Sequence, residues 1–250
     1  MIDKGVMAYC INTDRYRYDR IASKTIPLLV KNLGLPVTVV TNKDTLPSLP
    51  AIPSVDHIII ENQTGNFING KQWNNLDRHR AYELSPYDKT LLVDIDFFCY
   101  SDNLLTLFDT EHDFLVHDQV HDVTGKDSYN FRCNSAIPMV WATLIFFKKS
   151  QLAKSIFDMV AYIKSNYEYY CNLYRIDFTN FRNDYAFAMA LQQINGFGNY
   201  PVMPTKLATL PANAKVTSVD DNGLTWSIEG MQGNLAHTDV HVIDKGVAYV

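Results

Sequence analysis

Residues 90–102 read TLLVDIDFFCYSD and place two carboxylates, Asp94 and Asp96, where an apolar segment ends. The uninterrupted apolar run before them is typical of a central strand that is buried on both faces. The two acids are one residue apart, so on a regular strand they point to the same face, and a turn lets one bind a metal directly and the other through water. Acids at a strand end more often face water as loop residues. Within an apolar segment, however, unpaired acids are costly, so this stretch predicts a site for a hard divalent cation.

The composition predicts one globular domain. The chain has 250 residues, of which 47% are hydrophobic, enough to bury a sizeable core. Its apolar runs are too short to span a bilayer, and its first residues enter a strand pattern without room for a signal peptide, so we expect a cytoplasmic protein. The net charge of −5 argues against broad, non-specific binding of nucleic acid. The spacing of the cysteines indicates reduced packing residues rather than a metal or redox motif; they are Cys10, Cys99, Cys133 and Cys171.

Strand-like and helix-like segments alternate along the chain, which is the pattern of an α/β fold. The chain opens with a βαβ unit, and from residue 201 onward it consists of short β-like pieces separated by Pro and Gly. We therefore expect an α/β fold, a single domain over 1–250 with a mostly parallel central sheet flanked by helices. The expected strands are 5–11, 36–41, 55–60, 89–95, 113–116, 141–147 and 240–243, and the expected helices are 18–33, 75–84, 151–170 and 183–194.

Polar residues follow the first two expected strands at the point where each strand ends. Asn12 and Thr13 follow the first strand, and Asn42 follows the second. Ligands of open α/β sheets gather beyond the carboxyl ends of the strands, so these side chains and the two acids are expected to converge on one crevice that fits a nucleotide. Ordinary turn chemistry is the alternative for Asn12 and Asn42, and for either residue alone it is the commoner one.

Several short motifs lie in the order found in a known enzyme family. The βαβ start, the VDID of residues 93–96, the RND of residues 182–184 that opens a late helix, and the HVIDKG of residues 241–246 together resemble GT-A-fold glycosyltransferases. Small bacteriophage-encoded glycosyltransferases are similar in size. Such enzymes use a nucleotide-diphosphate sugar and a divalent metal. The resemblance implies a single GT-A-like domain, with a nucleotide-sugar half at about residues 1–100 and an acceptor and metal-completing half at about residues 101–250.

The resemblance also assigns roles to individual residues. It implies that Asp94 and Asp96 bind Mn²⁺ or Mg²⁺ on the donor diphosphate, that His241 completes the metal shell, and that Lys245 contacts the diphosphate. His237 is the competing histidine, and a hydrogen-bonded strand residue is the alternative role for either one. We favour His241 because Lys245 follows it at the place that the resemblance leads us to expect.

Two further candidates come from helices. The resemblance implies that the helix before the acids supplies an arginine to the donor, either Arg78 or Arg80; the alternative is a solvated helix face with an internal Asp77–Arg80 pair. Asp184 opens the late helix, where a carboxylate either caps the helix or faces the sugar or acceptor. If the reaction inverts the sugar's configuration, Asp184 is the candidate base, and if it retains configuration, Asp184 positions the substrate.

The expected function is transfer of a sugar from a nucleotide-diphosphate sugar, with a UDP-sugar as first candidate, to a hydroxyl acceptor. The leading acceptor hypothesis is a 5-hydroxymethylated pyrimidine in phage DNA, which implies action in the host cytoplasm. A surface glycan or small molecule is the alternative acceptor, and a non-catalytic nucleotide-binding module is the alternative function. A phosphoryl-transfer enzyme ranks lower because the chain has no Walker A motif. The long connection 117–138 is a candidate lid, and the candidate DNA contacts are Arg15, Arg17, Arg20, Arg175 and Arg182.

Overall fold

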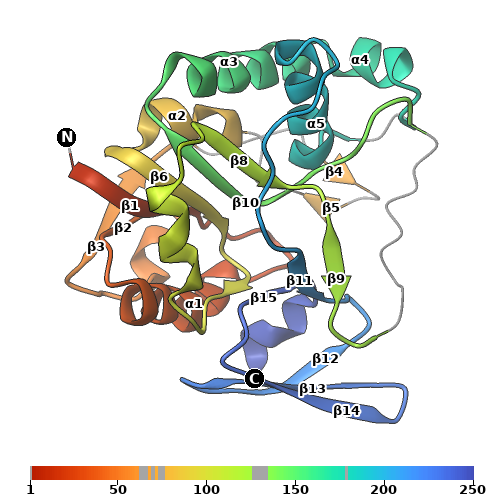
Figure 1. The fold of residues 1–250 in the computed structure, drawn as a ribbon. Helices are drawn as coiled ribbons and strands as arrows, with labels where there is room; N and C mark the ends of the chain where they lie inside the picture. Colours follow the sequence, from red (N-terminus) through yellow and green to blue (C-terminus); the bar gives the residue numbers. More distant parts are fainter. Residues whose placement is uncertain (1, 62–66, 69–70, 73–76, 126–134, 178–179) are drawn as a thin grey trace.

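The computed structural model describes residues 2–61, 67–68, 71–72, 77–125, 135–177 and 180–250 (Figure 1). Its centre is a six-stranded sheet in the order β3-β2-β1-β6-β10-β8. The strands β1, β2, β3 and β6 run parallel, whereas β10 is antiparallel to both β6 and β8. The expected mostly parallel central sheet is therefore confirmed. Its strands are β1 (Ile2–Tyr9), β2 (Val37–Thr41), β3 (Val55–Ile59), β6 (Tyr87–Asp94), β8 (Phe114–His117) and β10 (Trp141–Lys148).

The strand that carries the first acid lies inside this sheet, between β1 and β10. Leu91, Leu92 and Val93 are fully buried, as the uninterrupted apolar run predicts for a strand covered on both faces. Near the other end of β6 the backbone of β1 comes very close to Tyr87. A Cβ atom on Gly5 would lie 2.4 Å from the Tyr87 ring, so only glycine fits there. Because β1 and β6 pair in parallel, their carboxyl ends lie at the same edge of the sheet.

Helices cover both faces of the sheet (Figure 1). The helix α1 (Tyr18–Leu33) lies on one face, and α3 (Gln151–Ser165) and α5 (Asn183–Ile194) lie on the other. The expected bounds of α1 and α5 match the structure. The expected helix 151–170 is wrong in one respect, because the structure breaks it at Asn166 and starts α4 (Tyr167–Leu173) there. The Asn166 side chain donates to the carbonyl of Tyr162 at 2.9 Å, a local hydrogen bond of the kind that competes with helix continuation.

The expected helix 75–84 is also only partly present. Residues 75 and 76 lie outside the described residues, and the rest forms a single 3₁₀ turn, η2 (Arg78–Arg80), followed by the short helix α2 (Ala81–Leu84). The chain then passes through Ser85 and Pro86 into β6, and the residue before a proline is disfavoured in helical conformation. Ser85 is accordingly extended, with ψ of 128°.

A second sheet forms from short strands at the carboxyl edge of the first. Its order is β7-β15-β11-β9, and β15 (Val240–Val242) pairs with β7 (Phe97–Phe98) so that His241 lies opposite Phe97. The backbone N–H of Val242 also donates to the carbonyl of Asp96 at 3.0 Å. The β-like pieces expected after residue 201 thus bring the end of the chain to the turn that carries the second acid. The other strands of this sheet are β9 (Val120–Asp122) and β11 (Leu207–Leu210).

Of the remaining elements, η4 carries Lys245 to the candidate site, and most of the others lie farther from it. These elements are β4 (Phe67–Ile68), β5 (Lys71–Gln72), β12 (Lys215–Val219), β13 (Gly223–Ile228), β14 (Met231–Ala236), η1 (Leu46–Ser48), η3 (Asn103–Asp109) and η4 (Lys245–Tyr249). None of the described helices has the length and apolar character needed to cross a bilayer. The described cysteines Cys10, Cys99 and Cys171 are free and buried, whereas Cys133 lies outside the described residues. The candidate lid 117–138 includes β9, and its residues 126–134 also lie outside them.

Candidate metal and diphosphate site

Three predicted metal ligands come together at the carboxyl end of β6. Asp94 ends the strand, Asp96 lies in the following turn, and His241 lies on β15. One ligand atom from each residue lies within 4.8 Å of the others. Asp96 is 6% exposed and His241 is 7% exposed, and His241 Nε2 lies 3.4 Å from Asp96 Oδ1. Thr25 of α1 supports the turn, because its hydroxyl donates to the carbonyl of Ile95 at 2.8 Å.

Lys245 closes the same cluster from the beginning of η4. Its ammonium donates to Asp96 Oδ2 and lies 6.0 Å from the centre of the Tyr18 ring. Asp244 caps η4 by accepting from the N–H of Gly246 at 3.0 Å, which orients the turn that carries Lys245. Burial opposes ionisation of Asp96, but Lys245 and His241 outweigh it and hold the pKa of Asp96 well below its usual range. The two neighbouring basic side chains thus favour the ionised form of Asp96.

Arg78 contacts Asp94, the other acid of the cluster. It is almost fully buried, with 4% of its surface exposed. Its guanidinium forms an ion pair with Asp94 and also donates to the carbonyls of Ala142 and Thr143 on β10, the latter at 3.3 Å. Burial raises the pKa of Asp94, an effect that the nearby Arg78 charge opposes. The Asp94 side chain remains 36% exposed. Arg78 thus connects the end of β6 to the neighbouring strand β10.

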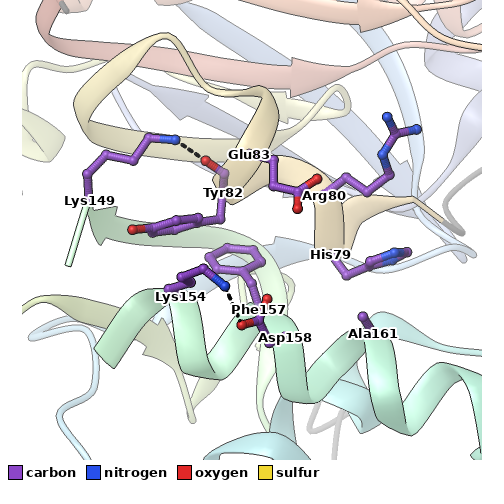
Figure 2. A pocket seen from close by; sticks show the side chains of 9 residues that line it. All are labelled: His79, Arg80, Tyr82, Glu83, Lys149, Lys154, Phe157, Asp158 and Ala161. Carbon is purple, nitrogen blue, oxygen red and sulfur yellow. Dashed lines mark hydrogen bonds and ion pairs between the residues drawn. The ribbon is translucent and has the colours of Figure 1, made fainter. Parts of the chain in front are cut away.

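Arg80, the other arginine proposed for the donor, lies elsewhere. It lies 3.7 Å from Asp77, which is the internal pair considered as the alternative for this segment. It also lines a pocket of about 370 Å³ between α2 and α3. Figure 2 shows Arg80 and Tyr82 on one wall of this pocket, with Lys154 and Phe157 of α3 opposite them. Arg78, rather than Arg80, contacts Asp94.

Asp184 lies close to the cluster and binds two partners. Its Oδ1 accepts from the N–H of Ala142 at 2.8 Å, and its Oδ2 accepts from Arg182 at 3.1 Å. The charge of Asp184 contributes to the raised pKa of Asp94. Among the bonds seen in the described part of the chain, Asp184 contacts β10 rather than capping α5. Asp184 therefore fixes the start of α5 against β10, the same strand whose carbonyls accept hydrogen bonds from Arg78.

The polar residues after β1 and β2 form turns that join to each other. Asn12 Oδ1 accepts from Asp19 N at 3.0 Å, Thr13 Oγ1 accepts from Tyr16 N at 3.0 Å, and Asn42 Oδ1 accepts from Thr45 N at 2.9 Å. The N–H of Asn12 in turn donates to Thr45 Oγ1 at 2.9 Å. The Asn42 bond is of the turn type considered as the alternative for that residue, whereas the Asn12 side chain accepts from the first turn of α1, seven residues away. These bonds also bring the two loops together at the carboxyl edge of the sheet.

Three residues near the cluster were not singled out from the sequence. Thr143 Oγ1 lies 3.5 Å from His241 Nδ1, and the Trp141 ring meets the His241 ring edge-on at 6.3 Å. Burial raises the pKa of the Tyr18 hydroxyl, and the charges of Asp96 and Asp94 raise it further. Thr143 had a detectable signal, because it is a polar residue in the otherwise apolar strand WATLIFF of residues 141–147.

His237, the competing histidine, does not join the described ligand cluster. It is exposed, has a positive φ of 50°, and lines a different pocket together with Asp239. Of the two histidines, His241 is the one whose ring faces the acids.

The sequence matches no family model and no curated protein. Among solved structures, the chain is similar to the glycosyltransferase GlyE of Streptococcus pneumoniae TIGR4, with 12% identity and a TM-score of 0.46 over 82% of this chain. It spans 46% of the GlyE chain. It is also similar to the galactosyltransferase LgtC in complex with donor and acceptor sugar analogs, with 13% identity and a TM-score of 0.48 over 74% of this chain and 70% of LgtC. An active-site mutant of LgtC gives 14% identity and a TM-score of 0.46 over 74% of this chain and 69% of the mutant chain.

Proposed function

We propose that this chain is a metal-dependent glycosyltransferase that moves a sugar from a nucleotide-diphosphate sugar, first of all a UDP-sugar, to a hydroxyl acceptor. One observation carries the proposal: Asp94, Asp96 and His241 offer three ligand atoms within 4.8 Å of one another, at the carboxyl end of β6. In open α/β sheets this edge is where ligands bind. The loops after β1 and β2 meet at the same edge through the Asn12–Thr45 hydrogen bond, and together they offer a place for the nucleoside.

The ligand set fits Mn²⁺ or Mg²⁺. Both ions prefer carboxylate oxygens, and an imidazole nitrogen completes a set that Mn²⁺ also accepts. Asp96 Oδ1 supports the fit, because it is buried and its near polar neighbour is Nε2 of His241 at 3.4 Å, itself a candidate ligand. When bound, the metal would stabilise the negative charge that develops on the departing diphosphate.

The chain's own residues supply the rest of the chemistry. We assign the diphosphate contact to Lys245, since its ammonium already lies at the acid cluster and a fixed cation there stabilises charge on a phosphate oxygen. We assign to Arg78 the positioning of Asp94, because the guanidinium is held between that acid and the β10 carbonyls. We assign to Asp184 the positioning of the sugar, with Ala142 and Arg182 fixing its orientation. If the product inverts configuration, Asp184 becomes the base.

The acceptor belongs to the same proposal. Of the arginines considered for DNA contact, Arg17 pairs with Asp19 at 2.6 Å and Arg182 pairs with Asp184 at 3.1 Å. Binding of DNA requires several net positive charges along the phosphate backbone, and carboxylates compensate two of the five arginines, so we favour a glycan or a small hydroxylated molecule over hydroxymethylated DNA. Both glycans and modified DNA are offered as acceptors in the assay.

The test is to incubate the purified chain with Mn²⁺ and a panel of sugar nucleotides, and to measure release of the nucleoside diphosphate. Mass spectrometry of added acceptors then reports sugar transfer to methyl glycosides and to duplexes that contain cytosine or 5-hydroxymethylcytosine. Asp96→Asn should reduce turnover at least about 100-fold, because a neutral amide replaces the charged carboxylate and leaves one oxygen instead of two for the metal. Asp109→Asn is the matched control, since Asp109 is an exposed acid at the end of η3.

The outcomes separate the alternatives. Turnover that requires Mn²⁺ or Mg²⁺ and is lost in Asp96→Asn, but not in Asp109→Asn, supports the proposal. Nucleotide binding without turnover of any sugar nucleotide would instead identify a non-catalytic nucleotide-binding module. Wild-type turnover by Asp96→Asn at low Mn²⁺ would refute the assignment of the metal site.

A further inference from the structure

An exposed apolar patch lies on the end of α3, on α4 and just after α5. Figure 1 shows α4 at the opposite end of the molecule from β12, β13 and β14. The Tyr170 ring of α4 connects the patch, because it lies 6.2 Å from the Tyr162 ring and 5.3 Å from the Tyr169 ring. The four side chains that we call the α4 patch are each at least half exposed: Tyr162, Tyr169, Leu173 and Phe197.

The backbone presents one of these rings in a strained conformation. Phe197 has a positive φ of 63°, which is uncommon for a bulky residue. Its N–H donates to the carbonyl of Gln192 at 2.9 Å, and its ring lies 6.3 Å from the ring of Tyr174. Strained positions are concentrated at functional sites, so a strained residue that exposes an aromatic ring indicates a binding surface.

The patch is large enough to form the apolar centre of a stable protein interface. A Tyr or Phe side chain can bury about 150–250 Å², and the three rings are 58–64% exposed, so together they leave about 280–460 Å² uncovered. Leu173 adds to this area. An interface of standard size covers about 800 Å² on each partner, of which about 65% is apolar in homodimers. The α4 patch therefore supplies much of the apolar surface that a homodimer needs.

The charges at the two ends of α4 make this face complementary to itself. Glu168 lies in the first turn of α4, and Arg175 follows shortly after its last residue, Leu173. Both charged side chains are exposed, and neither has an ion-pair partner among the residues that the structure describes. A two-fold axis at the middle of α4 would run the helices of two copies antiparallel, so that Glu168 of each copy lies near Arg175 of the other.

The apolar residues of α4 fit the same arrangement. Tyr169 and Leu173 are four positions apart and therefore share one side of the helix. In an antiparallel pair, Tyr169 of one copy meets Leu173 of the other, and the reverse contact forms at the symmetric position.

We propose that this face binds a second copy of the chain, so that the protein is a two-fold symmetric dimer in solution with the α4 patch at its centre. The metal cluster stays outside the interface. Asp184 opens α5 near the cluster and Phe197 lies beyond the other end of this 12-residue helix, so at the rise of an α-helix the two are roughly 18 Å apart. Formation of the dimer therefore does not depend on the proposed enzymatic activity.

The experiment measures the mass of the purified chain in solution at several concentrations, by sedimentation velocity and by light scattering. We expect a dimer with a dissociation constant of about 10 μM or below. Leu173→Arg places two cations at the centre of the apolar interface and should weaken the dimer about 30-fold or more. Leu152→Arg is the matched control, because Leu152 is an exposed leucine of α3 outside the patch, and it should leave the dimer unchanged.

Charge reversal tests the two-fold arrangement itself. Glu168→Arg alone, or Arg175→Glu alone, puts like charges opposite each other and should weaken the dimer about five- to tenfold. The two changes together restore opposite charges across the axis and should recover the association of the wild type. A purely structural role for either residue within one copy would not produce this recovery.

Each result decides the proposal. A dimer that is weakened by Leu173→Arg, unaffected by Leu152→Arg and recovered by the double reversal supports it. A chain that remains a monomer at every concentration overturns it, including a monomer that binds a saccharide or another protein through this face. A dimer that tolerates a folded Leu173→Arg, or that the double reversal does not recover, also overturns it. If circular dichroism shows that Leu173→Arg does not fold, the charge-reversal variants decide the question.

Discussion

Replacing Arg78 with methionine should destabilise the protein substantially, because it removes the buried partner of Asp94. Breaking a buried ion pair costs about 3–5 kcal/mol. The Asp94 side chain is 36% exposed, so water screens the remaining charge and we reduce that cost to about 2 kcal/mol. The carbonyls of Ala142 and Thr143 also lose a donor, which adds about 1 kcal/mol. For a chain of this size, a total of about 3 kcal/mol lowers Tm by roughly 6–12 °C.

The assay is thermal and urea unfolding of Arg78→Met, Asp94→Asn and the double variant, followed by circular dichroism. Since Asp94→Asn removes the charge that Arg78 compensates, the double variant should be more stable than the sum of the two single effects predicts, by about 1–2 kcal/mol. Arg80→Met is the control, because Arg80 is 42% exposed and lies 3.7 Å from its partner Asp77. It should change stability by less than about 0.5 kcal/mol. An unchanged Tm for Arg78→Met, or strictly additive effects, would refute this account of the ion pair.

Three other changes test separate parts of the structure. Lowering the pH from 6.5 to 4 should reduce stability by about 3 kcal/mol through His117, because unfolded histidine binds a proton near pH 6.5 whereas burial lowers the folded pKa of His117 to about 4; unfolding at several pH values should show this loss in the wild type and not in His117→Phe. Gly5→Ala should lower the free energy of unfolding by about 1–3 kcal/mol, since the new Cβ would lie 2.4 Å from the Tyr87 ring; unchanged urea unfolding would contradict the close contact. Lys245→Met should weaken binding of UDP about tenfold or more and leave binding of uridine unchanged, because the ammonium is expected to contact only the phosphates; calorimetric titration with both ligands checks this, and equal losses for both would argue against that contact.

The elements with strong local patterns could be predicted from the sequence. The bounds of α1 and α5 follow from the helical spacing of their apolar residues, and burial of Leu91 to Val93 follows from an uninterrupted apolar run. The break at Asn166 could not be predicted in this way, because apolar spacing continues across it and a local side-chain hydrogen bond decides the outcome.

In the candidate site too, local sequence patterns indicate some residues, whereas long-range pairing places the others. The position of Asp94 and Asp96 at a strand end is a local property, and sequence alone indicates it. The pairing of β15 with β7, which puts His241 beside Asp96, joins residues that are far apart in the chain, and many registers are compatible with such short strands. Sequence reasoning reached His241 only through the resemblance to a family.

The partners of the charged residues required the tertiary structure. Arg78 and Arg80 are two positions apart and equally basic, yet one is buried against Asp94 and the other lies beside Asp77 on a different pocket. The exposed edge of a short helix carries no local signal for which arginine enters the core. The buried nitrogen of His117, which has no hydrogen-bond partner among the described residues, likewise depends on how β8, β10 and the segment with Met203 pack together. Local patterns set the secondary structure because they depend on neighbouring residues, whereas ion pairs and pockets form only when distant segments meet.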